Sequence, residues 1–322
     1  MTISFVIPVR DDATRLRRCI RSIKENVSSR ATVEIIVVDN GSSDDSVEVA
    51  RAEDATVLQL PQTRLGELRN GGAAAAHGDV LAFVDADNEI APDWVQSALE
   101  ALAANHKVGA VGAPYSAPAP GTWVQQLYDR LRPHPSGRID VDWLWSGNMA
   151  ISRSAFEAVG GFDTALETCE DVDLCRKLRA RGYAVLADSR LENVHHGDPK
   201  TLRHVFLGEL WRGRDNVRVS LRAPRSFRTV VSAAISIWNL LALAVIAGGL
   251  LAGTRGGYIA ATTAAMTVFC LVALRAARMV TGGAIWSRYF EAFAVAGAYE
   301  LGRTLSLVAR TGYGRRRAGA TT

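Results

Sequence analysis

Cysteine is scarce in this sequence, with four residues among 322. Cys19, Cys169, Cys175 and Cys270 show neither a CxxC motif nor another metal-ligand spacing. They are also too few and too scattered for a disulfide-rich module, which is small and dense in cysteine. The cysteine content therefore favours a reducing cytosol over an oxidising compartment.

The N-terminus lacks the features of a secretory signal. Its first residues, MTISFVIPVRDD, contain no basic segment followed by a long apolar stretch. We therefore expect the soluble part of the protein to stay in the cytoplasm.

The whole chain is 48% hydrophobic and has a formal net charge of +4, but charged residues become scarce after about Val230. This change in composition predicts a catalytic domain over residues 1–228 and a membrane region over residues 229–322. Residues 230–253 and 257–274 are each about long enough to cross a bilayer, and a short turn joins them. They predict a transmembrane hairpin.

The arginine distribution predicts the orientation of this hairpin. Arginines crowd the segment before the first span, whereas Arg255 alone marks the turn. Because basic residues are enriched in cytoplasmic loops, both ends should face the cytoplasm of a multi-pass membrane protein. Such flanks also suit anionic lipid headgroups. The flanking arginines are Arg212, Arg214, Arg218, Arg222, Arg225 and Arg228, with Arg315, Arg316 and Arg317 closing the chain.

A last apolar segment covers residues 285–308 and is interrupted by charges, among them Arg288, Glu291 and Glu300. A third membrane span would bury these charges at a considerable cost in free energy. We favour an amphipathic helix at the membrane interface, with a third span as the alternative.

Before the boundary, short β-branched runs alternate with helical patterns. This alternation predicts an α/β fold with a Rossmann-like, mostly parallel sheet, in which ligands bind beyond the carboxyl ends of the strands. Residues 114–145 carry five of the ten prolines and predict loops over the site. The expected strands are 3–9, 33–38, 56–60, 80–84, 108–113 and 183–187, and expected helices include 65–76, one with Pro92 in its first position, and 170–181.

Acidic residues follow two of the expected strands. Asp39 ends the run VEIIVVD, and Asp85-Ala86-Asp87 follows LAFV. Carboxylates at this edge could hold a divalent cation, which neutralises the charge released when a sugar leaves a nucleotide diphosphate. For Asp39 the alternative is a simple turn, because the Asn-Gly-Ser-Ser that follows is typical of one.

Two further pairs have the chemistry of a transfer site. Glu170 and Asp171 open an expected helix, where acids ordinarily act as caps, but a carboxylate there could also take a proton from an acceptor hydroxyl. His195 and His196 lie late in the domain, and a neutral imidazole can bind a metal such as Mn²⁺. The alternative for the histidine pair is an ordinary surface position.

In this order along the chain, the motifs resemble glycosyltransferase family 2, of the membrane-anchored bacterial or archaeal type, whose catalytic domain has the GT-A fold. The resemblance covers roughly residues 3–216. Its segments are SFVIPVRDD, VVDNGSSDDS, RNGGAAAAHGDVLAFVDADN, SGNMAISRSAFEAVGGFD with the later Glu170-Asp171, and His195-His196.

The resemblance implies a role for each candidate residue. Asp171 would be the general base, with Glu170 beside it. Asp85 and Asp87 would form the DxD motif, with Asp87 in direct contact with Mn²⁺ or Mg²⁺ and His195 or His196 completing the metal site. Residues expected to bind the nucleotide sugar are Pro8, Val9, Arg10, Asp39, Arg69, Asp85, Arg212 and Arg214. Those expected to border the acceptor are Trp145, Ser146, Gly147 and Asn148.

Two departures from family patterns narrow the expected reaction. Residues 210–214, LWRGR, resemble a basic stretch near the diphosphate but depart from the QxxRW motif of processive synthases, which favours transfer of a single sugar. Residues 85–90, DADNEI, depart from the DADLSH of polyprenyl-phosphate mannose synthases. We therefore assign no polyprenyl phosphate acceptor.

The resemblance predicts an inverting glycosyltransferase at the cytoplasmic face of the cell membrane. It would use a UDP, GDP or dTDP sugar and a hydroxyl or lipid-linked glycan acceptor, in cell-envelope glycan or glycolipid synthesis. Membrane lipids are expected partners, and nucleic acid is not. One alternative is a nucleotidyltransferase, although the Gly-rich loop common after the first strand of such enzymes is missing. The other is a catalytically silent membrane protein that binds a sugar nucleotide.

Overall fold

The computed structural model describes residues 1–26, 31–222, 227–280 and 288–309, which form two compact units. The first comprises Met1–Ala119 and Arg132–Asp198, and the second comprises Pro120–Leu131 and the described residues from Pro199 onward. The units therefore divide the chain elsewhere than at the predicted boundary between residues 228 and 229, which stays a prediction. Arg225, Arg315, Arg316 and Arg317 lie outside the described residues.

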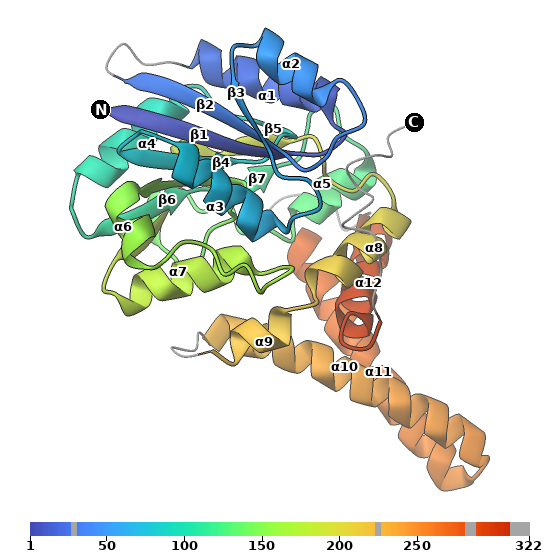
Figure 1. Ribbon diagram of the computed structural model, residues 1–322. Helices are drawn as coiled ribbons and strands as arrows, with labels where there is room; N and C mark the ends of the chain where they lie inside the picture. The colour runs from blue at the N-terminus through green and yellow to red at the C-terminus, as the bar shows by residue number, and fades with distance from the viewer. Residues whose placement is uncertain (27–30, 223–226, 281–287, 310–322) are drawn as a thin grey trace. The chain divides into compact units, whose positions relative to one another are not determined.

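The first unit is built on an eight-stranded sheet with the order β3-β2-β1-β4-β9-β6-β10-β8 (Figure 1). Strands β1, β2, β3 and β4 pair in parallel, as do β6 and β10. Strand β9 inserts antiparallel between β4 and β6, which the sequence did not indicate. The strands are β1 (Thr2–Val9), β2 (Thr32–Asp39), β3 (Thr56–Gln59), β4 (Val80–Val84), β6 (Val108–Gly112), β8 (Arg138–Asp140), β9 (Asn148–Ser152) and β10 (Ala184–Asp188).

Helices cover both faces of this sheet because the side chains of a strand alternate between its faces. Ile3, Phe5 and Ile7 of β1 pack in one core with α1, α2 and α4, whereas Val6 belongs to the opposite core with α3, α6 and α7. This two-sided layering confirms the predicted α/β fold. The helices are α1 (Ala13–Glu25), α2 (Ser46–Ala52), α3 (Leu65–Ala75), α4 (Trp94–Ala103), α6 (Arg153–Ala158) and α7 (Glu170–Ala180).

A small second sheet brings three distant segments together. Its order is β5 (Asn88–Glu89), β11 (Asn193–His195) and β7 (Tyr115–Ser116), with the short helix η1 (Ser189–Leu191) preceding β11. His195 pairs with Asn88, directly after the acidic tripeptide, and Asn193 pairs with Tyr115. The sheet thus fixes a histidine beside the end of β4.

Two expectations for the helices were wrong. Residues 114–145 are not loops throughout, because they contain β7, β8 and the helix α5 (Trp123–Asp129). Thr122 and Gln125 form a capping box at the start of α5, a signal that the sequence did contain. Pro92 is not in the first helical turn, since α4 begins at Trp94, after Asp93 with a φ of 62°.

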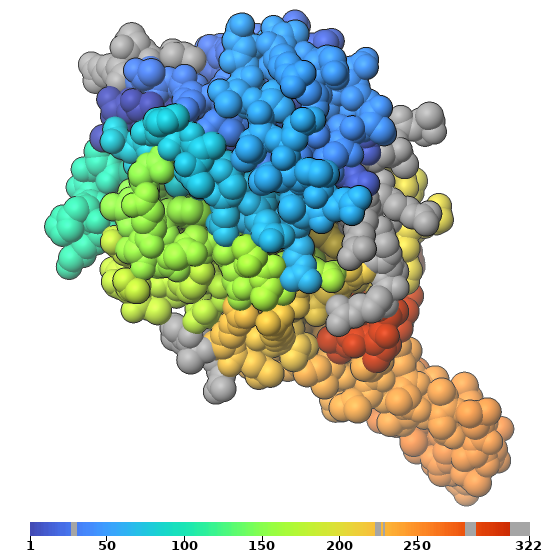
Figure 2. Space-filling model, in the orientation of Figure 1, coloured from blue at the N-terminus to red at the C-terminus, as the bar shows by residue number. Residues whose placement is uncertain are grey.

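The second unit contains two helices that are long and apolar enough to cross a membrane, Thr229–Ala252 and Arg255–Val280. They run side by side in opposite directions (Figure 1) and coincide with the predicted hairpin. Large apolar side chains of these helices, such as Leu241, Leu251 and Phe269, are exposed. Figure 2 shows the two helices in orange. The helices of this unit also include α8 (Leu202–Arg212), α9 (Asn216–Ser220), α10 (Phe227–Ala252), α11 (Arg255–Val280) and α12 (Tyr289–Leu305).

Helix α12 forms within the last apolar segment, of which residues 285–287 lie outside the described part of the chain. Its charges are paired: Glu300 bonds to Arg275 of α11, and Arg303 bonds to Glu209 of α8 at 3.0 Å. An interfacial position for α12, rather than a third span, stays a prediction.

Candidate active site

Asp85 and Asp87 lie at the carboxyl end of β4, as predicted. The backbone N–H of Asp85 donates to the carbonyl oxygen of Gly147 at 3.2 Å, which ties this turn to the segment before β9. A Cβ atom on Gly147 would lie 2.1 Å from Asp85 Oδ2. Glycine is therefore required here for the backbone to pack against the carboxylate.

Arg69 of α3 connects this carboxylate to the second acidic pair. Its side chain is 1% exposed, and its two terminal nitrogens bond to Asp85 Oδ1 at 2.6 Å and Glu170 Oε1 at 2.7 Å. The planar guanidinium suits such a two-sided contact. Arg69 thus holds Asp85 and Glu170 in place, and its expected contact with the base or the phosphates stays a prediction.

Glu170 and Asp171 begin α7, and the two carboxylates have different surroundings. Glu170 is buried and also accepts a hydrogen bond from Ser146 Oγ at 3.1 Å. Asp171 accepts from the backbone N–H of Val172 at 2.8 Å. Burial and the neighbouring Glu170 carboxylate raise the pKa of Asp171 to about 7. A carboxylate with this pKa is suited to general base catalysis near neutral pH.

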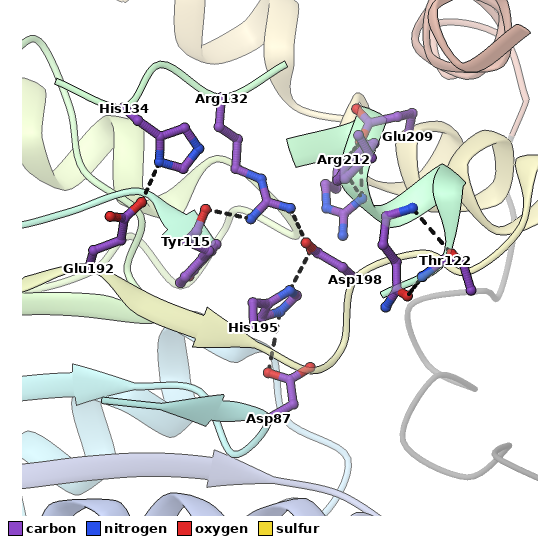
Figure 3. A network of polar contacts seen from close by, with 12 residues as sticks. Asp87, Tyr115, Thr122, Arg132, His134, Glu192, His195, Asp198, Glu209 and Arg212 are labelled. Atoms are coloured by element: carbon purple, nitrogen blue, oxygen red, sulfur yellow. Dashed lines mark hydrogen bonds and ion pairs between the residues drawn. The ribbon is translucent and has the colours of Figure 1, made fainter. Parts of the chain in front are cut away.

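His195 faces the acidic tripeptide from β11 (Figure 3). Its Nε2 lies 3.4 Å from Asp87 Oδ1, and its Nδ1 lies 2.7 Å from Asp198 Oδ1. Burial disfavours the charged imidazole, but the two carboxylates outweigh it and raise the pKa of His195 to about 9. Carboxylate oxygen and imidazole nitrogen together form a donor pair suited to Mn²⁺.

His196 has a different environment from His195. Its ring lies 2.9 Å from Glu89 Oε2 and 3.1 Å from Arg18, and its backbone N–H donates to the carbonyl oxygen of Asp87. Of the two histidines, His195 is thus the one whose side chain reaches Asp87. No group of three His, Cys, Asp or Glu side chains fit to hold a metal occurs among the residues that the structure describes.

The residues expected at the nucleoside pocket lie at the ends of β1 and β2. Pro8 and Val9 are buried, and Arg10 Nε lies 3.7 Å from Asp11 Oδ2. Asp39 is 1% exposed and accepts from the backbone N–H groups of Gly41 and Ser42. Asp39 therefore stabilises the turn after β2, and a contact with the nucleoside stays a prediction.

The residues expected at the acceptor differ in exposure. Trp145 is partly exposed and its ring centroid lies 4.4 Å from that of Trp143, whereas Ser146 is buried against Glu170. Asn148 is fully buried, because its amide bonds to the carbonyls of Ala113 and Leu191 and to the indole N–H of Trp94. Asn148 thus fixes the local backbone.

Arg212 and Arg214 belong to the second unit and not to the unit that carries the acidic residues. Arg212 bonds there to Glu209 Oε1 at 3.0 Å and to the hydroxyl of Tyr128 at 3.1 Å. Their expected approach to the diphosphate stays a prediction.

Sequence reasoning missed four residues around His195: Asp198, Arg132, Tyr115 and Gly197. Arg132 pairs with Asp198, and the Tyr115 ring stacks on His195 with 4.8 Å between the ring centroids (Figure 3). A Cβ on Gly197 would lie 1.8 Å from Asp87 Oδ2. For Gly197 and Asp198 the only signal was their place in the sequence HHGD. Arg132 and Tyr115 had no such signal, because they come from distant segments.

The fold and the site define the first unit as a GT-A domain. Residues 4–160 match the family model of glycosyl transferase family 2. A solved mannosyltransferase, PcManGT from Pyrobaculum calidifontis in complex with GDP-Man and Mn²⁺, has a TM-score of 0.63 at 17% identity, with 94% of this chain and 86% of that chain covered. GalNAc-T7 with UDP, GalNAc and Mn²⁺ has a TM-score of 0.52 at 20% identity, with 66% of this chain and 48% of that chain covered.

Curated relatives agree with this assignment. The pre-mycofactocin glycosyltransferase of Mycobacterium tuberculosis is 30% identical over 261 residues, which cover 75% of this chain and 53% of that protein. Glycosyltransferase AglE of Haloferax volcanii is 24% identical over 257 residues, covering 74% of this chain and 80% of that protein. The chain thus spans about half the length of the mycobacterial relative. Residues 4–160 are thus a glycosyl transferase family 2 domain.

Proposed function

We propose that this protein transfers a single sugar from a nucleotide diphosphate donor to a hydroxyl or lipid-linked acceptor, with inversion at the anomeric carbon. One observation carries the proposal. Two sets of contacts meet at the Asp85-Ala86-Asp87 turn, at the carboxyl edge of the sheet: His195 lies beside Asp87, and Arg69 bonds to both Asp85 and Glu170. This edge is where open α/β sheets bind their ligands.

The residues at this edge fit a divalent cation. Asp87 and His195 would hold it, and Asp85, anchored by Arg69, would lie beside them toward the donor. The exposed part of the Asp85 side chain, 30%, leaves its carboxylate accessible. Bound there, Mn²⁺ or Mg²⁺ supplies positive charge that stabilises the departing nucleoside diphosphate. The similar solved enzymes contain Mn²⁺, which supports this choice of metal.

The protein residues then perform a direct displacement. The acceptor oxygen attacks the anomeric carbon while Asp171 takes the proton of its hydroxyl group. The bond between the anomeric carbon and the diphosphate oxygen breaks on the opposite face, so the configuration inverts. Burial and the negative charge of Glu170, which Arg69 and Ser146 fix in place, raise the pKa of Asp171 enough for it to accept that proton at neutral pH.

The membrane hairpin would place this reaction at the cytoplasmic face. Helices α10 and α11 have the length and composition of membrane spans, and their arginine flanks favour a cytoplasmic catalytic unit. The basic flanks would contact anionic lipids, and the acceptor would come from cell-envelope glycan or glycolipid synthesis.

A donor panel tests this proposal. Purified full-length protein is incubated with UDP-, GDP- and dTDP-sugars, Mn²⁺ and membrane lipid extract, and release of the nucleoside diphosphate is measured. We expect one donor class to be consumed, and consumption to stop in excess chelator. Asp87→Ala should abolish turnover and weaken donor binding in Mn²⁺. Full activity in chelator would refute the metal-dependent mechanism.

A further inference from the structure

We infer that Asp198, Arg132 and Tyr115 are positioning residues that orient the imidazole of His195, so that its Nε2 is presented to a metal beside Asp87. This inference rests on the metal site of the proposed function. It concerns three residues to which that function assigns no role.

Asp198 determines which nitrogen of His195 points toward Asp87. Its side chain is 2% exposed, and its Oδ1 lies 2.7 Å from His195 Nδ1. A carboxylate accepts hydrogen bonds only, so it holds the proton of the imidazole on Nδ1. The other nitrogen, Nε2, faces Asp87, and it can bind a metal that displaces its proton. Metal-binding histidines in general have such a carboxylate or carbonyl partner on the second nitrogen.

Arg132 fixes Asp198 in turn. Its Nη2 bonds to Asp198 Oδ2, and its Nη1 donates to the carbonyl oxygen of Tyr115 at 2.9 Å. The two contacts use the rigid geometry of the guanidinium, which a flexible lysine ammonium cannot reproduce. Each oxygen of Asp198 therefore has its own partner, His195 on one side and Arg132 on the other.

Tyr115 closes the arrangement from the face of the imidazole. Its ring stacks on His195 at an interplanar angle of 20°, and the Arg132 guanidinium lies 5.7 Å from the centroid of the same ring. Tyr115 belongs to β7 and His195 to β11. The two rings lie side by side because these strands pair, with Asn193 opposite Tyr115. The stack fixes the ring plane, and Asp198 fixes rotation within that plane (Figure 3).

This geometry makes Asp198→Asn a sharp probe. If the new amide turns its oxygen to His195, its NH₂ faces the donors of Arg132 and repels them. If it turns its oxygen to Arg132, its NH₂ donates to His195 Nδ1 and moves the imidazole proton to Nε2, where the metal must bind. Either orientation disturbs the histidine, although the residue changes little in size.

The test measures metal binding directly, apart from activity. Mn²⁺ is titrated into the detergent-solubilised full-length protein, alone and with UDP or GDP, and the free ion is counted by electron paramagnetic resonance. We expect Asp198→Asn to weaken Mn²⁺ binding about 10- to 100-fold, the usual effect of losing such a partner. Arg132→Lys should weaken it in the same direction by less, and it serves as the second variant if Asp198→Asn does not fold.

Asp188→Asn is the matched control. Asp188 is also 2% exposed and also pairs with arginines, Arg138 and Arg190, both at 2.9 Å, but it does not contact His195. Its replacement should lower thermal stability without changing the affinity for Mn²⁺. An equal loss of Mn²⁺ binding in Asp188→Asn would overturn the inference, because the effect would then reflect general destabilisation.

His195→Ala distinguishes a failure of the positioning role from a failure of the proposed metal site. If His195→Ala loses Mn²⁺ binding while Asp198→Asn and Arg132→Lys bind as the wild type does, the positioning role is wrong and the proposed metal site stands. If the wild type binds no Mn²⁺ under any of these conditions, the metal site and the positioning role are both wrong.

Discussion

At the scale of single residues, Asp171 has the most direct consequence for the reaction. Asp171→Asn nearly preserves size and still accepts the hydrogen bond from the Val172 N–H, so it separates a base from a helix cap. We expect sugar transfer to fall by roughly 10² or more while nucleotide affinity and folding survive. A role as a cap alone predicts a loss of at most about 1 kcal/mol of stability and a normal rate. Transfer assays beside donor titrations distinguish the two.

The pKa of Asp171 gives a pH dependence with a definite sign. A base acts in its deprotonated form, and burial with the Glu170 carboxylate raises the pKa of Asp171 to about 7. The transfer rate should therefore fall by about tenfold per pH unit below pH 7 and level off above it. The residual rate of Asp171→Asn should not show this fall below pH 7. The same fall in that variant would assign the titration to another group.

Arg69 affects stability because it neutralises two carboxylates at a buried position. Arg69→Met would leave Asp85 and Glu170 without their shared partner, and we expect a loss of about 3–5 kcal/mol in the free energy of unfolding. Thermal unfolding of Arg69→Met, compared with that of a matched surface variant, measures this loss of stability. Arg179→Met breaks an exposed pair with Asp140 and should cost at most about 1 kcal/mol. Equal losses in the two variants would contradict the bridging role.

Most of the proposed catalytic residues could be located from the sequence because each follows a strand or lies in the first turn of a helix. Asp85 and Asp87 follow β4, Asp171 lies in the first turn of α7, and all three lie where the pattern placed them. The contacts around His195 could not be located, since Arg132 and Asp198 are 66 residues apart and meet only through tertiary packing. Local patterns predict which groups reach an edge of the sheet, and packing decides which of them touch.

At the scale of elements, the alternation of apolar runs predicted β1, β2, β3, β4, β6 and β10 but not the antiparallel β9. The residues of β9, NMAIS, follow a motif with no turn signal that distinguishes an antiparallel insertion from another parallel strand. Helix α5 was missed because the prolines around it dominated the pattern. The long apolar helices were the easiest to predict, since their length and composition suffice.

The contact between α10 and α11 depends on two glycines that face each other, Gly249 and Gly257. A Cβ on Gly249 would lie 2.3 Å from the carbonyl oxygen of Gly257, whereas a Cβ on Gly248 would meet nothing within 4 Å. Small residues allow such close approach of helices in membranes. We expect Gly249→Ala to separate the helices and cost about 1–3 kcal/mol. Gly248→Ala should be neutral or stabilising because alanine favours helix. Thermal unfolding in detergent compares them, and equal stability would contradict the close contact.

At the scale of the whole molecule, the open question is whether α10 and α11 cross a membrane. If they do, Arg255 lies on the opposite side of the membrane from the first unit, which is the catalytic unit. Arginines precede α10, whereas Arg255 begins α11 after the short turn. If basic segments stay in the cytoplasm, this turn emerges on the opposite side from the sheet. We therefore expect a cysteine at residue 255 and a cysteine on the catalytic unit to differ in accessibility.

Cysteine labelling tests this topology in a variant whose four native cysteines are replaced. Arg255→Cys reports on the turn, and Asp54→Cys, at a side chain that is 91% exposed, reports on the catalytic unit. A membrane-impermeant maleimide added to intact cells should label residue 255 at once and residue 54 only after lysis, because a charged reagent does not cross the bilayer. Protection of both residues until lysis would place the turn on the cytoplasmic side. In that case α10 and α11 would lie on the membrane or pack against protein, and their exposed Leu251 and Phe269 would need another apolar partner.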